Sequence, residues 1–250
     1  MKAMVLAAGL GTRLRPLTDD RPKALVEIAG RTLLEIALAR LHEFGVREVV
    51  INVHHFADKV KNYLKAHDYF GMRIAISRED DVLLDTGGGL KKAAEFFLRD
   101  AQAEEPILVH NVDVLSTIDL VKMAESHRAR RALATLAVQE RKTSRYLLFD
   151  EEMMLCGRRI GEVATAEVVR ASRMAVPLAF AGIHIISPRL FNMLAEDGAF
   201  SIITSYLRLT GAGERIMGFR ADGAYWRDLG RPEDLVWAAE DLRSGRVGSA

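Results

Sequence analysis

The sequence predicts an α/β protein with a Rossmann-like three-layer α/β/α fold around a central, mostly parallel mixed sheet. Short apolar or β-branched runs at residues 5–7, 49–53 and 106–109 have the composition of buried strands. Segments with helical spacing of apolar residues separate these runs. Strands that alternate with helices need crossover connections, which are right-handed and place successive strands side by side in a parallel sheet.

The first predicted helix has a signal at each end. Thr32 and Glu35 form a capping-box pattern, apolar residues recur at helical spacing as far as Leu41, and Gly45 follows as a helix-ending glycine. Further helices are expected at 57–66, 89–97, 118–127, from Ser187-Pro188 onward, and at 232–243. Further strands are expected at 72–77, 134–138, 178–186, 215–220 and 225–228, with a hairpin of 146–150 and 153–156. Residues 244–250 are expected to form a flexible tail.

Composition excludes several classes of function. The chain has 250 residues, of which 49% are hydrophobic, and we expect residues 1–243 to form one domain. The formal net charge of +1 gives no electrostatic basis for binding nucleic acid or a membrane surface. No apolar run approaches the roughly 20 residues of a membrane helix. The single cysteine, Cys156, excludes an intrachain disulfide and is typical of a cytoplasmic protein.

A glycine loop follows the first predicted strand and reads Leu6-Ala7-Ala8-Gly9-Leu10-Gly11-Thr12-Arg13. Glycines leave backbone amides open and permit the positive φ that turns successive N–H groups toward one anion. Arg13 adds a guanidinium suited to phosphate. The loop is neither a P-loop, which needs Gly-Lys-Ser/Thr, nor the dinucleotide fingerprint, which needs a third glycine. It predicts a phosphate site of another kind.

The longer string from Leu6 to Thr18, followed by Pro22-Lys23-Ala24-Leu25-Val26, resembles the signature of the sugar-1-phosphate nucleotidyltransferases. The resemblance implies the nucleotide-diphospho-sugar transferase fold. It also implies that the loop wraps a nucleoside triphosphate and that Lys23 contacts phosphate oxygens. The nucleotide-binding residues that it implies here are Leu6, Ala7, Ala8, Gly9, Gly11, Thr12, Arg13 and Lys23. Residues 1–140 would then bind the nucleotide and residues 141–230 the sugar.

Two aspartates match the metal ligands of this family. Asp113 follows the strand at 106–109, and Asp228 precedes a Gly-Arg-Pro helix start, as the family's second metal-binding aspartate does. The resemblance implies that both hold Mg²⁺ and that Arg13, Lys23, Asp113 and Asp228 are catalytic. The family has glycine where this chain has Val112, and we expect this valine to narrow the space near the metal.

A second glycine cluster and a later strand are expected to contact the base and the sugar. The segment Leu84-Asp85-Thr86-Gly87-Gly88-Gly89-Leu90 lies at a strand–helix junction, and 180–183 match the sugar-side strand of the family. The resemblance implies nucleotide contacts from Asp85, Thr86 and Gly87, and sugar contacts from Gly88, Asn111, Phe180 and Gly182. No Glu-Lys-Pro segment supplies a second phosphate lysine, so Arg170 or Arg173 is a candidate to hold the sugar phosphate.

Phe180 narrows the resemblance within the family. Many relatives have asparagine at this position, whereas phenylalanine resembles the uridylyltransferases that act on N-acetylmuramate 1-phosphate in cell-wall sugar recycling. The expected partners are a nucleoside triphosphate, UTP in the main interpretation, and a sugar 1-phosphate. The protein would be a monomer or small homo-oligomer that contacts neither nucleic acid nor membrane. The alternatives are a guanylyltransferase for mannose or heptose 1-phosphate and a catalytically silent, nucleotide-binding regulatory protein.

Overall fold

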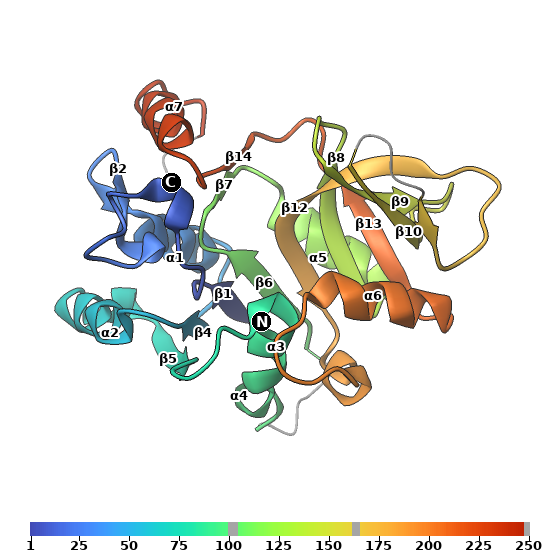
Figure 1. Cartoon of the computed structure of the whole chain (residues 1–250), viewed down its shortest axis with the longest axis horizontal. Helices are drawn as coiled ribbons and strands as arrows, with labels where there is room; N and C mark the ends of the chain where they lie inside the picture. The colour runs from blue at the N-terminus through green and yellow to red at the C-terminus, as the bar shows by residue number, and fades with distance from the viewer. Residues whose placement is uncertain (100–104, 162–165, 248–250) are drawn as a thin grey trace.

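A mixed sheet runs through the computed structural model, which describes residues 1–99, 105–161 and 166–247 (Figure 1). In spatial order its strands are β11 (Glu167–Val168), β10 (Leu155–Ile160), β9 (Arg145–Phe149), β12 (Val176–Ile186), β6 (Ile107–Asn111), β1 (Lys2–Leu6), β4 (Glu48–Val53) and β5 (Arg73–Arg78). Two more strands branch off this order at β12. There β8 (Ala134–Gln139) pairs with β12 and with β13 (Ile216–Arg220). The pairs from β6 through β1 and β4 to β5 are parallel, and β12 runs antiparallel to β6.

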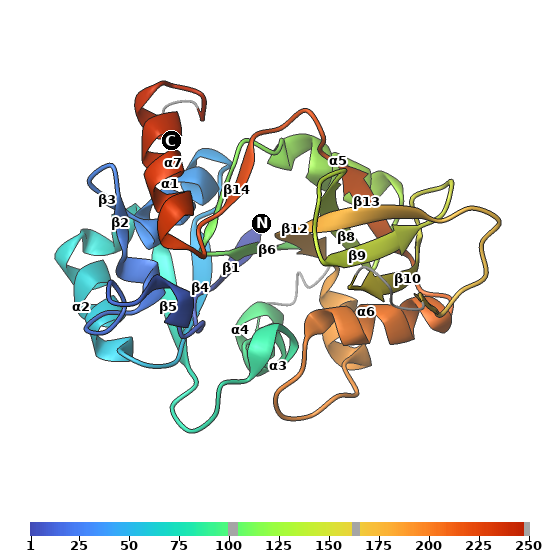
Figure 2. The ribbon, with the colours of Figure 1, turned by 45° about the horizontal axis from the view of Figure 1, so that its top comes forward.

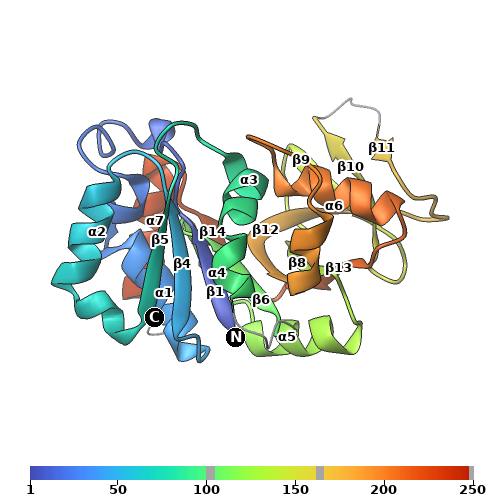
Figure 3. The ribbon, with the colours of Figure 1, turned by 90° about the horizontal axis from the view of Figure 1, so that it is seen from below.

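Helices cover both faces of this sheet. They are α1 (Leu33–Glu43), α2 (Ala57–Ala66), α3 (Asp85–Lys92), α4 (Ala94–Leu98), α5 (Leu120–Ala129), α6 (Ile202–Gly211) and α7 (Pro232–Arg243). Figure 3 shows α1 and α2 on one side of β4 and β5, with α3 and α4 on the other. Short 3₁₀ helices lie at Thr12–Leu14, Lys23–Leu25, Asp68–Gly71 and Pro188–Met193.

The hydrophobic core has two main parts, one on each face of the sheet. Val5 of β1 belongs to the cluster that contains α1 and α2, whereas the neighbouring Met4 belongs to the cluster that contains Phe97 of α4. Successive side chains of a strand point to opposite faces, so a strand that feeds two clusters must be covered on both sides. The predicted three-layer α/β/α fold with a central mixed sheet is therefore confirmed.

Two small ribbons complete the fold. The strand β7 (Val114–Ser116) follows β6 closely and pairs antiparallel with β14 (Trp226–Asp228). The other ribbon joins β2 (Glu27–Ile28) to β3 (Arg31–Thr32). Figure 2 shows β14 passing between the two halves of the molecule toward α7. The ribbon of β7 and β14 therefore connects the end of β6 to the C-terminal part of the chain.

The first helix has the ends that its sequence predicts. The Thr32 side chain accepts a hydrogen bond from the Glu35 amide at 3.1 Å. At the other end Gly45 has φ +89°, and the amide of Val46 bonds back to the carbonyl of Leu41 at 3.0 Å. Both ends therefore satisfy backbone groups that a helix leaves without partners.

Two expectations about helices were wrong, and one helix was missed. The helix expected at 89–97 begins at Asp85, and it is divided at Ala93 into α3 and α4. The segment after Ser187 forms a 3₁₀ helix, and the Ser187 side chain makes no capping hydrogen bond to it. The helix α6 was not predicted at all, although Ser201 caps it by accepting from the Ile203 amide.

The end of the described chain packs against the fold. Residues 244–247 form turns, the Arg246 amide bonds to the Asp241 carbonyl at 3.1 Å, and Val247 is buried. The rest of the expected tail, 248–250, lies outside the described residues. None of the helices within the described ranges combines the length and the apolar character that crossing a membrane requires.

Candidate active site

The glycine loop leaves the carboxyl end of β1 and folds back over the segment that carries Lys23. Gly11 has φ +65°, and a Cβ atom there would lie 3.0 Å from Cγ2 of Thr18 and 3.1 Å from Cβ of Lys23. The Thr18 hydroxyl donates to the Gly11 carbonyl at 2.9 Å. Gly11 is therefore needed both for its backbone conformation and for the close approach of the two segments.

Lys23 and Asp113 form an ion pair beneath this loop. The side chain of Lys23 is only 9% exposed and that of Asp113 is 21% exposed. Asp113 lies in the turn between β6 and β7, and its carbonyl accepts from the Leu229 amide at 2.8 Å. Asp228 of β14 pairs with Val114, the residue after Asp113, so the pairing of β14 with β7 brings the two predicted metal ligands close together.

The surroundings of Asp228 bring the fourth predicted catalytic residue into the site. Burial raises the pKa of Asp228 and the Asp113 carboxylate raises it further, while Lys23 and Arg13 act in the opposite direction. A Cβ atom on Gly230 would lie less than 3.0 Å from both Nη2 of Arg13 and Oδ1 of Asp228. The four predicted catalytic residues therefore lie together: Arg13, Lys23, Asp113 and Asp228. Their site is beyond the carboxyl ends of β1 and β6, which is where parallel α/β sheets bind ligands.

Val112 fills the core. It is buried in the cluster that contains Val5 and Leu108, and its amide donates to the Leu6 carbonyl at 3.0 Å. The valine side chain therefore contributes to the packing of the sheet, and the expectation that it narrows the space near the metal stays a prediction.

Two of the expected sugar-binding residues, Asn111 and Gly182, meet where β6 lies against β12. Gly182 has φ +72°, and a Cβ atom there would lie 2.9 Å from Nδ2 of Asn111 and 3.0 Å from Cγ2 of Val114. Phe180 lies earlier on the same strand and packs edge to face on His184, with ring centroids 5.6 Å apart. Asn111 and Gly182 thus lie together next to Val114, which follows Asp113, and the role of Asn111, Phe180 and Gly182 in binding sugar stays a prediction.

Arg141 is a candidate site residue that sequence reasoning missed. Its guanidinium lies 3.6 Å from the ring centroid of Trp226 and donates to the Phe180 carbonyl at 2.8 Å. Burial lowers the pKa of Arg141, and the nearby Asp228 opposes that change. Its Nε is buried and has no hydrogen-bond partner among the described residues. Its position shortly after the strand predicted at 134–138 was the only signal in the sequence.

The arginines that the sequence suggested for the sugar phosphate lie elsewhere. Arg170 forms an ion pair with Asp150, at the hairpin between β9 and β10. Arg173 is exposed in the segment before β12. The structure does not bring either of them to Asp113 or Asp228.

The second glycine cluster forms the first turns of α3. The Gly87 amide donates to the Phe200 carbonyl at 2.8 Å, and the Thr86 hydroxyl accepts from the Ile202 amide at 3.0 Å. Cβ atoms on Gly87 and Gly88 would lie less than 3.0 Å from the 198–200 segment. These glycines therefore allow α3 to pack against the start of α6. The predicted contacts of Asp85, Thr86, Gly87 and Gly88 with base or sugar stay predictions.

A buried polar network joins the two glycine segments. The Asn52 side chain accepts from the Ala7 amide at 2.8 Å and donates to Oε1 of Glu79 at 2.7 Å. The other oxygen of Glu79 accepts from the Leu84 amide at 2.9 Å. The side chains of Asn52 and Glu79 are almost wholly buried, so each of these hydrogen bonds replaces a hydrogen bond that the group would make to water in the unfolded chain. The network fixes the first glycine segment relative to the second.

Comparison with known proteins shows which family the chain belongs to. A family model described as nucleotidyl transferase matches residues 2–152. The chain is 38% identical to the N-acetylmuramate alpha-1-phosphate uridylyltransferase of Caulobacter vibrioides over 96% of each protein. It is 30% identical to the protein of that name from Neisseria meningitidis serogroup B, over 92% of this chain and 93% of that protein.

A solved structure shares the fold at low sequence identity. The inositol-1-phosphate CTP transferase from T. maritima superposes with a TM-score of 0.77 at 17% identity, over 100% of this chain and 97% of that one. The structural likeness concerns the fold, and the sequence matches concern the family. The chain belongs to the nucleotidyl transferase family.

Proposed function

We propose that the chain transfers a uridylyl group from UTP to a sugar 1-phosphate of the N-acetylmuramate type and releases pyrophosphate. The observation that carries this proposal is the meeting of Asp113 and Asp228 with Lys23 and Arg13 beneath the glycine loop. Two relatives whose names state this activity align with more than nine-tenths of the chain. The free, buried Cys156 suits the reducing cytoplasm that we propose as its location.

A magnesium ion fits the donor set of this site. Mg²⁺ is usually held by one or two carboxylates, and phosphate and water oxygens complete its coordination. Asp113 and Asp228 are the carboxylates that would hold it, since the Asp113 carboxylate is close enough to raise the pKa of Asp228. When bound, the ion would neutralise charge on the α-phosphate and on the pyrophosphate leaving group.

The side chains of the site would act by positioning and by charge. A phosphate oxygen of the sugar 1-phosphate forms a bond to the α-phosphorus of UTP, and the bond from that phosphorus to the oxygen bridging to the β-phosphorus breaks. The attacking oxygen is already ionised near neutral pH, so no strong base is needed. Lys23 and Arg13 would bind the triphosphate oxygens together with the amides of the glycine loop.

Arg141 is the residue that we assign to the phosphate of the sugar substrate. It lies against Trp226, two residues before Asp228, and it also reaches the carbonyl of Phe180. A guanidinium fixed by stacking is preorganised to donate in one plane, which suits a phosphate group. Arg141 would therefore hold the attacking phosphate beside the two carboxylates.

The test is a product assay that crosses the four nucleoside triphosphates with the 1-phosphates of N-acetylmuramate, glucose and mannose. Release of pyrophosphate with UTP and N-acetylmuramate 1-phosphate, dependent on Mg²⁺, is the expected result. Strong turnover only with GTP and mannose 1-phosphate would replace this proposal with a guanylyltransferase. Nucleotide binding without product in every combination would replace it with a regulatory, nucleotide-binding protein.

A further inference from the structure

A pocket apart from the candidate active site lies between α1, β7 and the start of α5, with a volume of about 400 Å³. This volume falls within the range of small-molecule sites. None of Arg13, Lys23, Asp113 and Asp228 lines it, so it is separate from the site that we assign to the reaction. Its walls are formed mainly by apolar side chains, which include Ile36, Phe44, Leu115 and Leu120.

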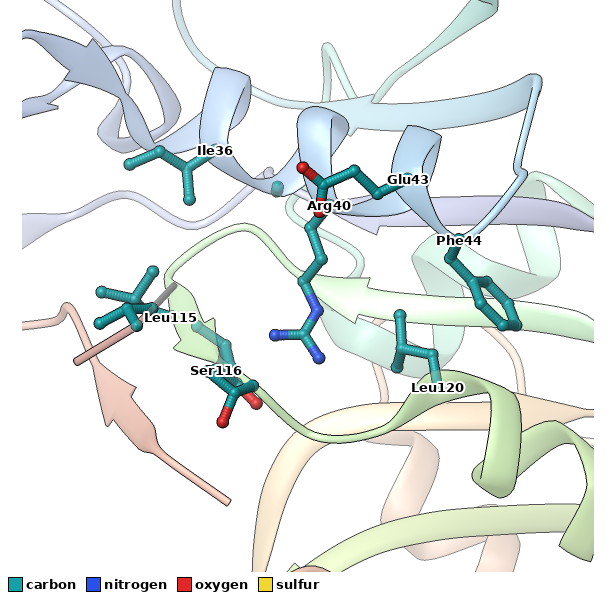
Figure 4. A pocket seen from close by; sticks show the side chains of 11 residues that line it. Ile36, Arg40, Glu43, Phe44, Leu115, Ser116 and Leu120 are labelled. Carbon is teal, nitrogen blue, oxygen red and sulfur yellow. The ribbon is translucent and has the colours of Figure 1, made fainter. Parts of the chain in front are cut away.

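Arg40 extends from α1 into this pocket, between Ser116 and Leu120 (Figure 4). The guanidinium donates to the Ile118 carbonyl, but its Nε is buried without a hydrogen-bond partner among the described residues. Burial lowers the pKa of Arg40 to about 10, and the charge of Glu43 opposes this change. Within the described ranges no carboxylate forms an ion pair with Arg40, although the exposed Glu43, one turn further along α1, also lines the pocket. A buried cation without an ion pair is costly, and an anion bonded directly to the guanidinium would offset that cost.

Two hydroxyl groups line the pocket beside this cation. The Ser116 oxygen accepts from the Ile118 amide at 3.1 Å, and the Thr117 oxygen accepts from the Tyr225 amide at 3.0 Å. Each hydroxyl therefore still has its own proton to donate. A guanidinium and two hydroxyl donors next to apolar walls match a ligand with an anionic group on an apolar body.

The pocket is connected to the catalytic carboxylates through one strand pair. Ser116 pairs with Trp226 and Val114 pairs with Asp228, so the ribbon of β7 and β14 has the pocket on one side. Asp113 directly precedes β7, and the Thr117 amide also bonds to the Tyr225 carbonyl at 3.0 Å. A ligand bonded to Ser116 or Thr117 would thus act on the two strands that position both aspartates.

We propose that this pocket is a regulatory site for a small organic anion, in which a phosphate or carboxylate bonds to Arg40 and an apolar group packs between α1 and α5. The ligand changes the rate of the reaction by shifting the β7–β14 ribbon. Binding at the pocket does not depend on which nucleotide or sugar the enzyme uses.

Hydrogen exchange locates the binding. The full chain, saturated with UTP and Mg²⁺ to occupy the catalytic site, is treated with phenyl phosphate, with benzoate, or with uncharged benzyl alcohol. We expect phenyl phosphate or benzoate to slow exchange at least twofold in peptides covering 33–44 and 114–121, and benzyl alcohol to have no effect. Comparing the two anions shows which head group is preferred. Slower exchange only at 6–25 would mean binding at the catalytic site and would overturn the proposal.

Substitutions of Arg40 provide the second arm. Arg40→Met is expected to abolish the protection, and Arg40→Lys, which keeps the charge without the planar fork, to weaken it. The matched control is Arg128→Met on the exposed side of α5, which should behave as wild type. The anion that protects should also change the rate of pyrophosphate release at least twofold in wild type and not in Arg40→Met. Protection that survives in Arg40→Met, or protection without any change in rate, would contradict the proposal.

Discussion

Lys23 donates from its ammonium to the carboxylate of Asp113, which lies 90 residues further along the chain. Lys23 comes from a short 3₁₀ helix after Pro22, and Asp113 comes from the turn after β6. Removing one partner of a buried ion pair leaves the other charge without compensation. The pair therefore ties the glycine-loop segment to the proposed metal site, and both members should matter for turnover.

Asp113→Asn tests the carboxylate directly. The amide keeps the size of the side chain but removes the charge that a magnesium ion would need, so we expect turnover to fall about a hundredfold or more. The measurement is the steady-state rate of pyrophosphate release, with circular dichroism to verify folding. Glu125→Gln on the exposed face of α5 is the control for a lost carboxylate, and it should retain the wild-type rate. Full activity in Asp113→Asn would remove Asp113 from the catalytic site.

Gly230→Ala tests the contact between Arg13 and the site. The new methyl group would lie less than 3.0 Å from Nη2 of Arg13 and Oδ1 of Asp228, so one of them must move. We expect kcat/KM for the nucleotide to fall about tenfold or more, since a small displacement of catalytic groups is costly. Gly223→Ala is the matched control, because nothing lies within 4 Å of the added atom there. Equal kinetics in the two variants would show that Arg13 is not held in the position described.

The proposed catalytic residues could be singled out from the sequence because each lies in a short contiguous string. Lys23 lies within a signature with the glycine loop, and Asp113 and Asp228 each lie in a local pattern that the family shares. Sequence reasoning could not show how the aspartates meet, because that depends on the pairing of β7 with β14. Nor could it identify Arg141, whose contact with Trp226 spans 85 residues and belongs to no motif.

The glycines of α3 show why the structure of a segment cannot always be predicted from its own sequence. Three consecutive glycines suggest a loop, since glycine weakens a helix. In the fold they are the residues that let α3 approach the 198–200 segment and the Glu79 side chain. That requirement comes from a distant part of the chain. By contrast α6 had a usable signal, with Ser201 as its cap and apolar residues at Ile202, Tyr206 and Leu209.

Arg141→Lys tests the assignment of the sugar phosphate. Lysine keeps the charge but loses the planar donors, and a charge-assisted hydrogen bond contributes about 1.5–3 kcal/mol. We therefore expect KM for the sugar 1-phosphate to rise roughly tenfold or more, with KM for UTP changed less than about twofold. Arg145→Lys on the exposed start of β9 is the control. A rise confined to the KM of UTP would move Arg141 to the nucleotide end.

His127 makes folding stability depend on pH, far from the catalytic residues. Burial is the main reason that the pKa of His127 is lowered from its ordinary value of 6.5 to about 4 in the folded protein. Its Nδ1 lies 2.9 Å from the Thr135 hydroxyl. Between pH 6.5 and 4 the unfolded chain binds a proton at this residue that the folded chain does not. The stability that depends on neutral His127 is therefore present above pH 6.5, and it is lost as the pH falls toward 4.

The size of this effect can be measured by urea unfolding at pH 7.5 and pH 5. With 1.36 kcal/mol for each pH unit below 6.5, His127 should account for about 2 kcal/mol of the stability lost at pH 5. His127→Gln has no proton to take up, so it should lose about 2 kcal/mol less than wild type over the same interval. The control is His67→Gln, at the exposed end of α2, which should lose as much as wild type. Equal losses in His127→Gln and wild type would mean that the buried ring of His127 already carries its proton at pH 5, or that the unfolded chain does not take one up.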